Sequence, residues 1–319
     1  MKTVTETEIL VPRGEMLRAS LSYGIWIRIN LILGWLTPLR FIPKVARAIG
    51  MRRQYRTKRA LLTSGGLDRD LVEEWMNDNV SRVDGTEARK LRDHAVDAEK
   101  IRNSDRFGMV QKGAALLSYV LERNRTLIGS AANIGARIDP TFAYMAKAWP
   151  GTKFISIDMQ NNIRESNQAL GLSDNWDFAS MYALDGFRNG EVRADLVYMT
   201  STSPKFNTVE LRDYLEAFRK SDVRVVIFNE PWWIFPLGFD CLGTMLPESV
   251  DPEHSRLGGF LADYQHNYLA ALRRTGFTTV LCRLRPGTCS SGGLYHHLQI
   301  VAVNDAFADA FRFDAAEAP

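Results

Sequence analysis

The chain has 319 residues, of which 45% are hydrophobic and 24% charged, a balance typical of a soluble globular protein. That length accommodates one large domain, or one domain with an appendage. The three cysteines (Cys241, Cys282, Cys289) are odd in number and lack C-x-x-C spacing, which argues against a disulfide framework or a zinc site. Because the start MKTVTETEIL is also too polar for a signal-peptide core, we expect a cytoplasmic protein.

The net charge of +3 is distributed unequally along the chain. Residues 1–60 hold 12 Lys/Arg against 3 Glu, a balance of +9, whereas the remainder is at −6. Within residues 20–59, the apolar run Ile25–Leu36 is too short to cross a bilayer, and prolines and a basic cluster follow it. Such a segment suits contact with a membrane surface. An arm packed on the main domain, or on a second subunit of a homodimer, is the alternative. The aliphatic content argues against a nucleic-acid partner.

Residues 64–104 are polar and charged, and we expect exposed helices there. A domain boundary is therefore predicted near residue 100, with an N-terminal helical region at 1–104 and the main domain at 105–319. The main domain begins with an amphipathic helix, Lys112–Arg123, that leads into the first strand.

The stretch Arg125–Asp158 is the centre of the prediction. A short apolar run, a turn of small residues at Gly129–Gly135 and a helical stretch precede a second apolar run, Phe154–Ile157, which ends on Asp158. This order predicts a strand–turn–helix–strand unit of the βαβ type. An acid about 20 residues beyond a small-residue turn is the arrangement that binds the ribose hydroxyls of a nucleotide cofactor.

The alternation of strands and helices continues to the end of the chain. An irregular, aromatic-rich insertion follows Pro231, and a final pair of strands closes the sequence. The order predicts an α/β fold with a doubly wound, mainly parallel sheet and a closing hairpin. The remaining strands are expected at Trp176–Met181, Asp195–Met199, Val223–Phe228, Thr278–Leu284 and His297–Val303, and the helices at Asn161–Leu170, Thr208–Arg219 and His254–Arg274.

From Asp105 to Asn304 the sequence resembles the class I S-adenosylmethionine-dependent methyltransferase family. That family has an acidic-x-Gly-x-Gly-x-Gly turn after its first strand. Here Ala131, Asn133 and Gly135 align with the three glycines, and Gly129 stands where the acid is expected. The two closing strands also match this family, and they distinguish it from the Rossmann-type dehydrogenases, which lack them. The resemblance implies a seven-stranded sheet with an antiparallel last strand, and S-adenosylmethionine as the cofactor.

The resemblance also implies which residues bind this cofactor. Asp158 aligns with the acid that accepts hydrogen bonds from both ribose hydroxyls, although a helix N-cap is its alternative role. Tyr182 aligns with the residue that flanks adenine, beside Met181, and Asp185 is the alternative hydrogen-bonding partner. The implied cofactor-binding set is Gly129, Ser130, Ala131, Asn133, Gly135, Asp158, Met159, Met181, Tyr182 and Thr200.

The acceptor of the methyl group is expected beyond the carboxyl ends of the fourth and fifth predicted strands. Glu230 and His266 are the candidates for a general base, which a hydroxyl acceptor requires. A solvated carboxylate and a packing histidine are the alternatives. The Trp/Phe-rich insertion suits an apolar or planar acceptor. No carboxylate–histidine spacing indicates a metal, and no GxSxG or HExxH pattern indicates a hydrolase.

These features predict methyl transfer from S-adenosylmethionine to an oxygen or nitrogen of a small-molecule or lipid-like acceptor. Two alternatives stay open: an NAD(P)-dependent oxidoreductase, and a non-catalytic binding protein with the same fold.

Overall fold

The computed structural model describes residues 95–104, 107–136, 138–159, 163–206, 208–232, 256–258, 263–266, 268–288 and 294–319. The basic arm at 20–59 and the aromatic residues at 233–255 lie outside the described residues, as does most of the predicted region 1–104. The domain boundary therefore stays a prediction.

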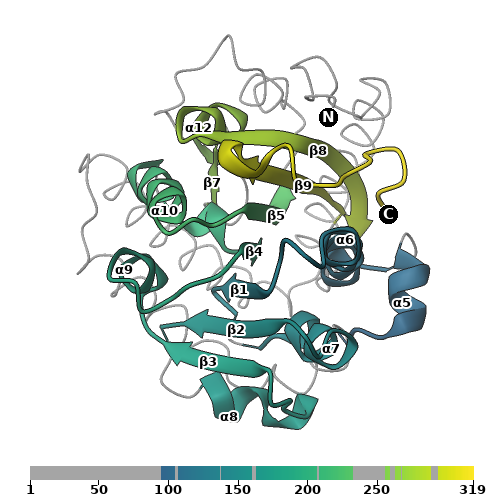
Figure 1. Cartoon of the computed structure of the whole chain (residues 1–319). Coiled ribbons are helices and arrows are strands. Elements are labelled where there is room, and N and C mark those ends of the chain that lie inside the picture. Colours follow the sequence, from purple (N-terminus) through teal and green to yellow (C-terminus); the bar gives the residue numbers. More distant parts are fainter. Residues whose placement is uncertain are drawn as a thin grey trace, which may run out of the picture.

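Seven strands form one sheet in the order β3-β2-β1-β4-β5-β9-β8, from the bottom of Figure 1 to the top. The strands β1 to β5 are parallel, and β9 is antiparallel to both of its neighbours, β5 and β8. The predicted mainly parallel, seven-stranded sheet with an antiparallel last strand is confirmed. The strands are β1 (Ser130–Ile134), β2 (Lys153–Asp158), β3 (Trp176–Ser180), β4 (Leu196–Thr200), β5 (Val225–Trp232), β8 (Phe277–Thr288) and β9 (Leu294–Asn304).

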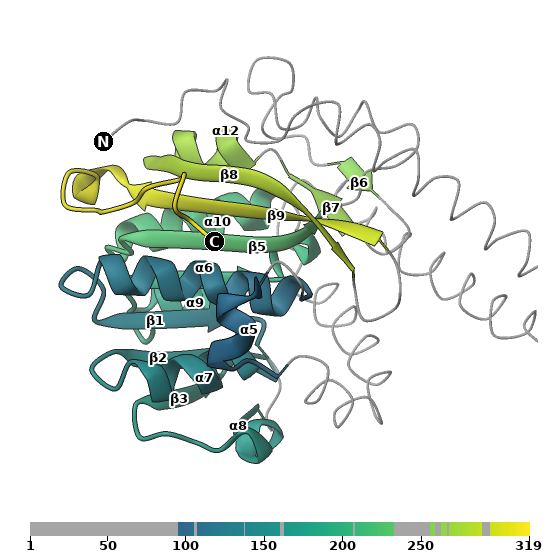
Figure 2. The same cartoon turned by 90° about the vertical axis from the view of Figure 1, so that its right-hand side faces the viewer.

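Helices cover both faces of this sheet (Figures 1 and 2). One hydrophobic cluster joins α9, α10 and α12 to their face of the sheet, and a second joins α6 and α7 to the other face. The described helices are α5 (Ala98–Arg102), α6 (Met109–Arg123), α7 (Pro140–Ala148), α8 (Ile163–Asn167), α9 (Ala183–Arg188), α10 (Thr208–Lys220) and α12 (Tyr268–Arg274). Among the described residues, no helix is long and apolar enough to span a bilayer.

Helix α6 lies unusually close to the sheet at Gly113. A Cβ atom at this position would stand 2.3 Å from both the Tyr198 hydroxyl and the Asn229 Nδ2. The same Asn229 amide donates a hydrogen bond to the carbonyl of Met109 at 3.0 Å, at the start of α6. The absence of a side chain at Gly113 therefore lets polar groups of β4 and β5 reach the helix.

Several predicted elements are wrong in their bounds. The predicted turn at Gly129–Gly135 is largely the strand β1, and the apolar run before it forms a turn. The predicted helix His254–Arg274 begins only at Tyr268, and the described residues before it form a short ribbon, β6 (Arg256–Gly258) and β7 (Asp263–Gln265). The closing strands are longer than predicted because their pairing continues to Thr288 and Leu294.

Candidate functional site

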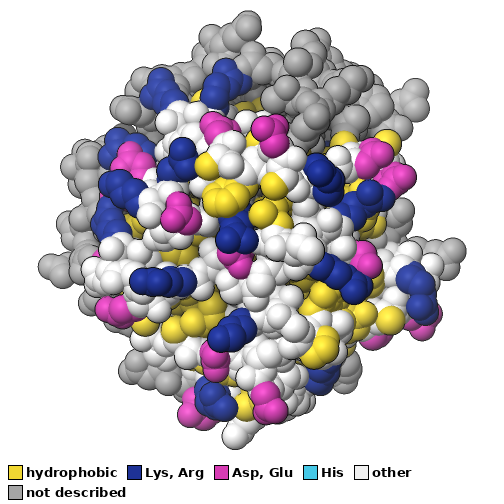
Figure 3. All heavy atoms as spheres, viewed as in Figure 1, with side chains coloured by type: hydrophobic (Ala, Val, Ile, Leu, Met, Phe, Trp, Pro, Cys, Tyr) yellow, Lys and Arg dark blue, Asp and Glu magenta, His cyan; other side chains and the backbone are white. Residues whose placement is uncertain are grey.

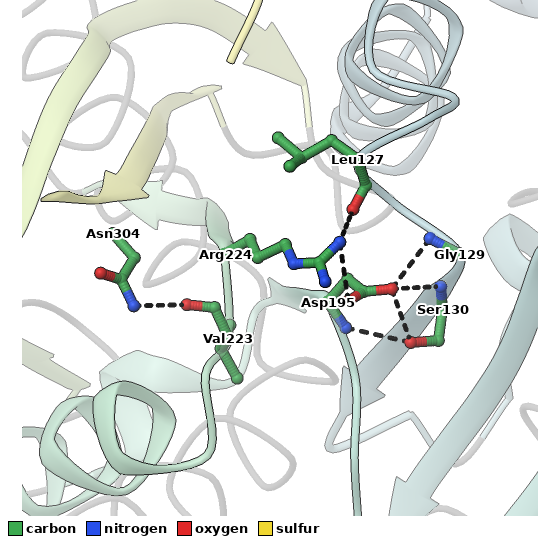
Figure 4. A network of polar contacts seen from close by, with 7 residues as sticks. All are labelled: Leu127, Gly129, Ser130, Asp195, Val223, Arg224 and Asn304. Atoms are coloured by element: carbon green, nitrogen blue, oxygen red, sulfur yellow. Dashed lines mark hydrogen bonds and ion pairs between the residues drawn. The ribbon is translucent and has the colours of Figure 1, made fainter. Parts of the chain in front are cut away.

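Two residues of the predicted cofactor turn lie at the wrong edge of the sheet. Ser130 pairs with Lys153 at the start of β2, so Gly129 and Ser130 lie at the amino ends of the strands, opposite Asp158. Both residues serve a polar network there (Figure 4). The Asp195 carboxylate accepts hydrogen bonds from the Gly129 N–H (2.8 Å), the Ser130 N–H (3.0 Å) and the Ser130 hydroxyl (3.1 Å). This geometry assigns them to the junction of β1 and β4.

The network extends through Arg224, just before β5. Its guanidinium lies 3.3 Å from the Asp195 carboxylate and donates to the Leu127 carbonyl. The network thus ties together the amino ends of three central strands.

On the face drawn in Figure 3, described basic and acidic side chains alternate over the surface and leave apolar side chains between them.

Ala131 and Asn133, aligned above with the first two glycines, lie inside β1. Both are buried, on the face that α6 and α7 cover. The Asn133 amide donates to the Asp139 carboxylate at 2.7 Å, and its Oδ1 has no hydrogen-bond partner among the described residues. These two residues are therefore part of the strand and do not form the turn that the glycine pattern predicts.

The turn that does leave the carboxyl end of β1 starts at Gly135. This exposed residue has a φ of +73°, in the left-handed region that favours glycine. The N–H groups of Gly135 and Ala136 both donate to the Ile157 carbonyl, at 2.8 and 3.2 Å. The turn is thereby attached to β2 one residue before Asp158.

Asp158 ends β2 as predicted, and its side chain is buried to all but 7%. Its backbone carbonyl accepts a hydrogen bond from the N–H of Met181 at 2.9 Å, which fixes the turn after β3 beside it. Gly135, Asp158, Met159 and Met181 thus meet at the carboxyl ends of β1, β2 and β3. This part of the carboxyl edge borders the switch point between β1 and β4, where open α/β sheets bind their ligands.

Tyr182 precedes α9 and is half-buried. Its hydroxyl donates to the Glu210 carboxylate, and its ring meets Tyr214 edge-on, with centroids 6.0 Å apart. Burial, followed by the charge of Glu210, raises the pKa of Tyr182 above its ordinary value. The Tyr182 hydroxyl is thus engaged with α10, so the ring, rather than the hydroxyl, is the part suited to contact a bound base.

A buried acid that the sequence did not reveal lies at the start of α7, after the carboxyl end of β1. Asp139 caps α7 by accepting from the Phe142 N–H at 2.9 Å, and it also accepts from Ser156 and Asn133, both at 2.7 Å. Burial raises its pKa to about 6, although these donors oppose the shift. The signal was Asp139 directly before Pro140, an N-cap followed by a proline in the first turn.

Glu230 lies in β5 at the carboxyl edge and is wholly buried. Its carboxylate accepts from the backbone N–H groups of Thr202 and Ser203, both at 3.0 Å, and from the Ser203 hydroxyl at 2.7 Å. It is therefore not the solvated carboxylate of our alternative reading. A base must reach the proton of its acceptor, whereas this carboxylate faces the loop after β4. The role of general base stays a prediction without geometric support.

His266 is buried beside the same loop. Its Nε2 lies 3.1 Å from the Ser203 carbonyl, and its ring meets that of Tyr268 edge-on.

Thr200, predicted to contact the cofactor, ends β4, and its hydroxyl accepts from the Asn229 amide at 3.2 Å. Within the described part of the chain, no group of three metal-ligating side chains is close enough to hold an ion.

No family model matches the chain, and no curated protein matches it. Solved structures do resemble it. Magnesium protoporphyrin IX methyltransferase from Synechocystis PCC 6803, with bound SAM, is 13% identical over 75% of this chain and 98% of its own, with a TM-score of 0.47. The N-methyltransferase NodS from Bradyrhizobium japonicum WM9 is 11% identical over 61% of this chain and 94% of its own, with a TM-score of 0.41.

A third structure, the dimethyltransferase RosA from Streptomyces davawensis, is 14% identical over 60% of this chain and 53% of its own, with a TM-score of 0.38. At such identities and TM-scores, these likenesses are too distant to carry over a substrate or the role of a residue.

Proposed function

We propose that this chain is an S-adenosylmethionine-dependent methyltransferase that acts on an oxygen or nitrogen of a small-molecule or lipid-like acceptor. One observation carries the proposal: the Gly135 turn is hydrogen-bonded to β2 directly beside Asp158. The last strand of the chain, β9, is antiparallel to β5. An antiparallel last strand distinguishes the methyltransferase resemblance from a Rossmann-type dehydrogenase.

The residues at this carboxyl edge suit the proposed cofactor. A carboxylate accepts two hydroxyl hydrogen bonds at once, as the ribose requires, and Asp158 offers one at the end of β2. Gly135 presents an exposed turn of backbone at this edge, where the methionine part would approach. Met181 and the Tyr182 ring stand after β3, where they suit the adenine.

Methyl transfer is an in-line displacement in which the bound cofactor supplies an electrophilic methyl group on a sulfonium. The work left to the chain is to hold donor and acceptor in line, and such positioning supplies a large part of the acceleration. The buried contacts at the carboxyl edge suit this task because they fix the turns after β1, β3 and β4 to neighbouring strands.

The acceptor class rests on the sequence alone. The aromatic insertion after Pro231 supports an apolar or planar acceptor, and the basic, aliphatic residues 20–59 support contact with a membrane surface. Flotation with anionic liposomes, comparing the full chain with a chain that lacks residues 1–60, tests the second point. Recovery of both proteins in the unbound fraction would end the interfacial proposal.

Isothermal titration with S-adenosylmethionine tests the cofactor. We expect binding by the full chain, and a loss of at least about tenfold in affinity for Asp158→Ala, because one hydrogen bond to a charged group contributes about 1.5–3 kcal/mol. Asp177→Ala, at an exposed position of β3, is the matched control and should bind as the parent does. Binding of NAD in place of S-adenosylmethionine would support the oxidoreductase alternative.

A further inference from the structure

Glu230 is joined to the candidate cofactor turn by a chain of contacts that crosses three strands. Its carboxylate extends from β5 and accepts hydrogen bonds from the backbone N–H groups of Thr202 and Ser203, both at 3.0 Å. The Ser203 hydroxyl adds a bond of 2.7 Å to the same carboxylate and lies 2.8 Å from the Tyr268 hydroxyl. The loop after β4 is thus fixed from the side of β5 and α12.

The other side of Thr202 faces β1. Its hydroxyl donates to the Ile134 carbonyl at 2.9 Å, and its Oγ1 and Cγ2 fill the space where a Cβ of Gly135 would lie, at 2.6 and 2.7 Å. The Gly135 N–H then donates to the Ile157 carbonyl at 2.8 Å, directly before Asp158. The position of Thr202 therefore bears on the turn that borders Asp158.

The backbone between these contacts is held in an unfavourable conformation. Ser201 has a φ of +56°, which costs a residue with a side chain free energy that the surroundings must offset. Its side chain is exposed, whereas those of Thr202 and Ser203 are buried. The bonds from Glu230 to the two following N–H groups are contacts that maintain this conformation.

We propose that Glu230 is a positioning residue: acting through Thr202, it sets the place of the Ile134–Gly135 turn and hence the affinity for the cofactor. The positioning stands on the contacts above, and its effect on affinity rests on the proposed function. The group would serve the reaction without touching the reacting atoms.

Two variants separate the links of this chain. Glu230→Gln keeps the shape of the side chain but replaces one oxygen with an amide that cannot accept a backbone N–H. Thr202→Val keeps the size of that side chain, leaves the Glu230 bonds in place and removes the hydroxyl that bonds to the carbonyls of Ile134 and, at 3.2 Å, Thr200. Glu191→Gln, an exposed position beyond α9, is the matched control.

Amide hydrogen exchange of the full-length chain reads the positioning without any ligand. In Glu230→Gln and in Thr202→Val we expect the amides of Gly135 and Ala136 to exchange about tenfold faster. The Asn304 amide, at the amino edge of the sheet, should exchange as in the parent. Faster exchange at Thr202 and Ser203 alone, with Gly135 unchanged, overturns the proposal. If Glu230→Gln does not fold, unchanged Gly135 exchange in Thr202→Val overturns it equally.

Titration with S-adenosylhomocysteine then measures the effect of each variant on the affinity for the cofactor product. We expect about a tenfold loss of affinity in each single variant and no further loss in the double variant, because both act on one turn. Independent, multiplying losses would contradict a shared route. A parent chain that binds no S-adenosylhomocysteine would refute the proposed function, while the exchange rates would still decide the positioning.

Discussion

Replacing Gly135 with alanine tests the turn at the centre of the proposed site. The residue has a φ of +73°, and an added Cβ would lie 2.6 Å from the Thr202 Oγ1 and 2.7 Å from its Cγ2. The Thr202 side chain has little room to withdraw, because it is buried and its hydroxyl is hydrogen-bonded to the Ile134 carbonyl at 2.9 Å. Two separate costs therefore add at this position.

The first cost is conformational: a left-handed backbone costs a residue with a side chain about 1–2 kcal/mol. The second is steric, since inserting a methyl group into a packed site costs about 1–3 kcal/mol. Gly190 separates the two costs. Its φ is +74°, and a Cβ there would meet nothing within 4 Å, so Gly190→Ala carries the conformational cost alone.

Urea denaturation followed by circular dichroism measures both variants. We expect Gly135→Ala to lower the free energy of unfolding by about 1–3 kcal/mol more than Gly190→Ala does, the steric cost alone. In a Thr202→Ala background that excess should largely vanish. Equal losses for the two glycine variants would refute the inference that the Gly135 turn is packed against the loop after β4.

Three further outcomes follow from the contacts of single side chains. Burial raises the pKa of Asp139 to about 6 in the folded chain, so its contribution to stability is complete below about pH 4 and falls as the pH rises toward 6, by about 3 kcal/mol for two pKa units. Urea denaturation at several pH values should show that this fall is absent from Asp139→Asn. Ser201→Gly should raise the free energy of unfolding by about 1 kcal/mol, because glycine accepts the positive φ, and a lower value would contradict strain there. Asp195→Ala should destabilise the chain by about 2 kcal/mol and leave S-adenosylhomocysteine affinity unchanged, since Gly129 and Ser130 lie at the opposite edge from Asp158.

The order of elements was predictable from the sequence, and the position of the first strand was not. Apolar runs ending at Asp158 and Phe228 indicate buried parallel strands, and the structure has β2 and β5 there. The strand β1 reads SAANI, whose small and polar residues suggest a turn. It is a strand because tertiary packing overrides that composition: Ala131 and Ala132 are fully buried on opposite faces.

In the candidate site, the location of a single residue could be predicted from the sequence, whereas contacts between residues far apart in the chain could not. Asp158 could be named because it aligns with the ribose-binding acid of the family that the sequence resembles, and the structure has it at the end of β2, as predicted. The engagement of Glu230 with Thr202 and Ser203 could not be predicted, because residues 27 and 28 positions apart in sequence meet only in the folded sheet. The same holds for Ser156 and Asp139, whose contact joins β2 to the cap of α7.

The position of β9 in the sheet determines when the sheet can be completed during synthesis of the chain. β9 lies between β5 and β8, yet it leaves the ribosome after both. Until Leu294–Asn304 has emerged, the edge of β5 stands open, and an open edge with the apolar residues Val225–Phe228 invites pairing between nascent chains. A chaperone that shields this edge would therefore act late in translation, and a stop codon before Leu294 should yield an aggregating product.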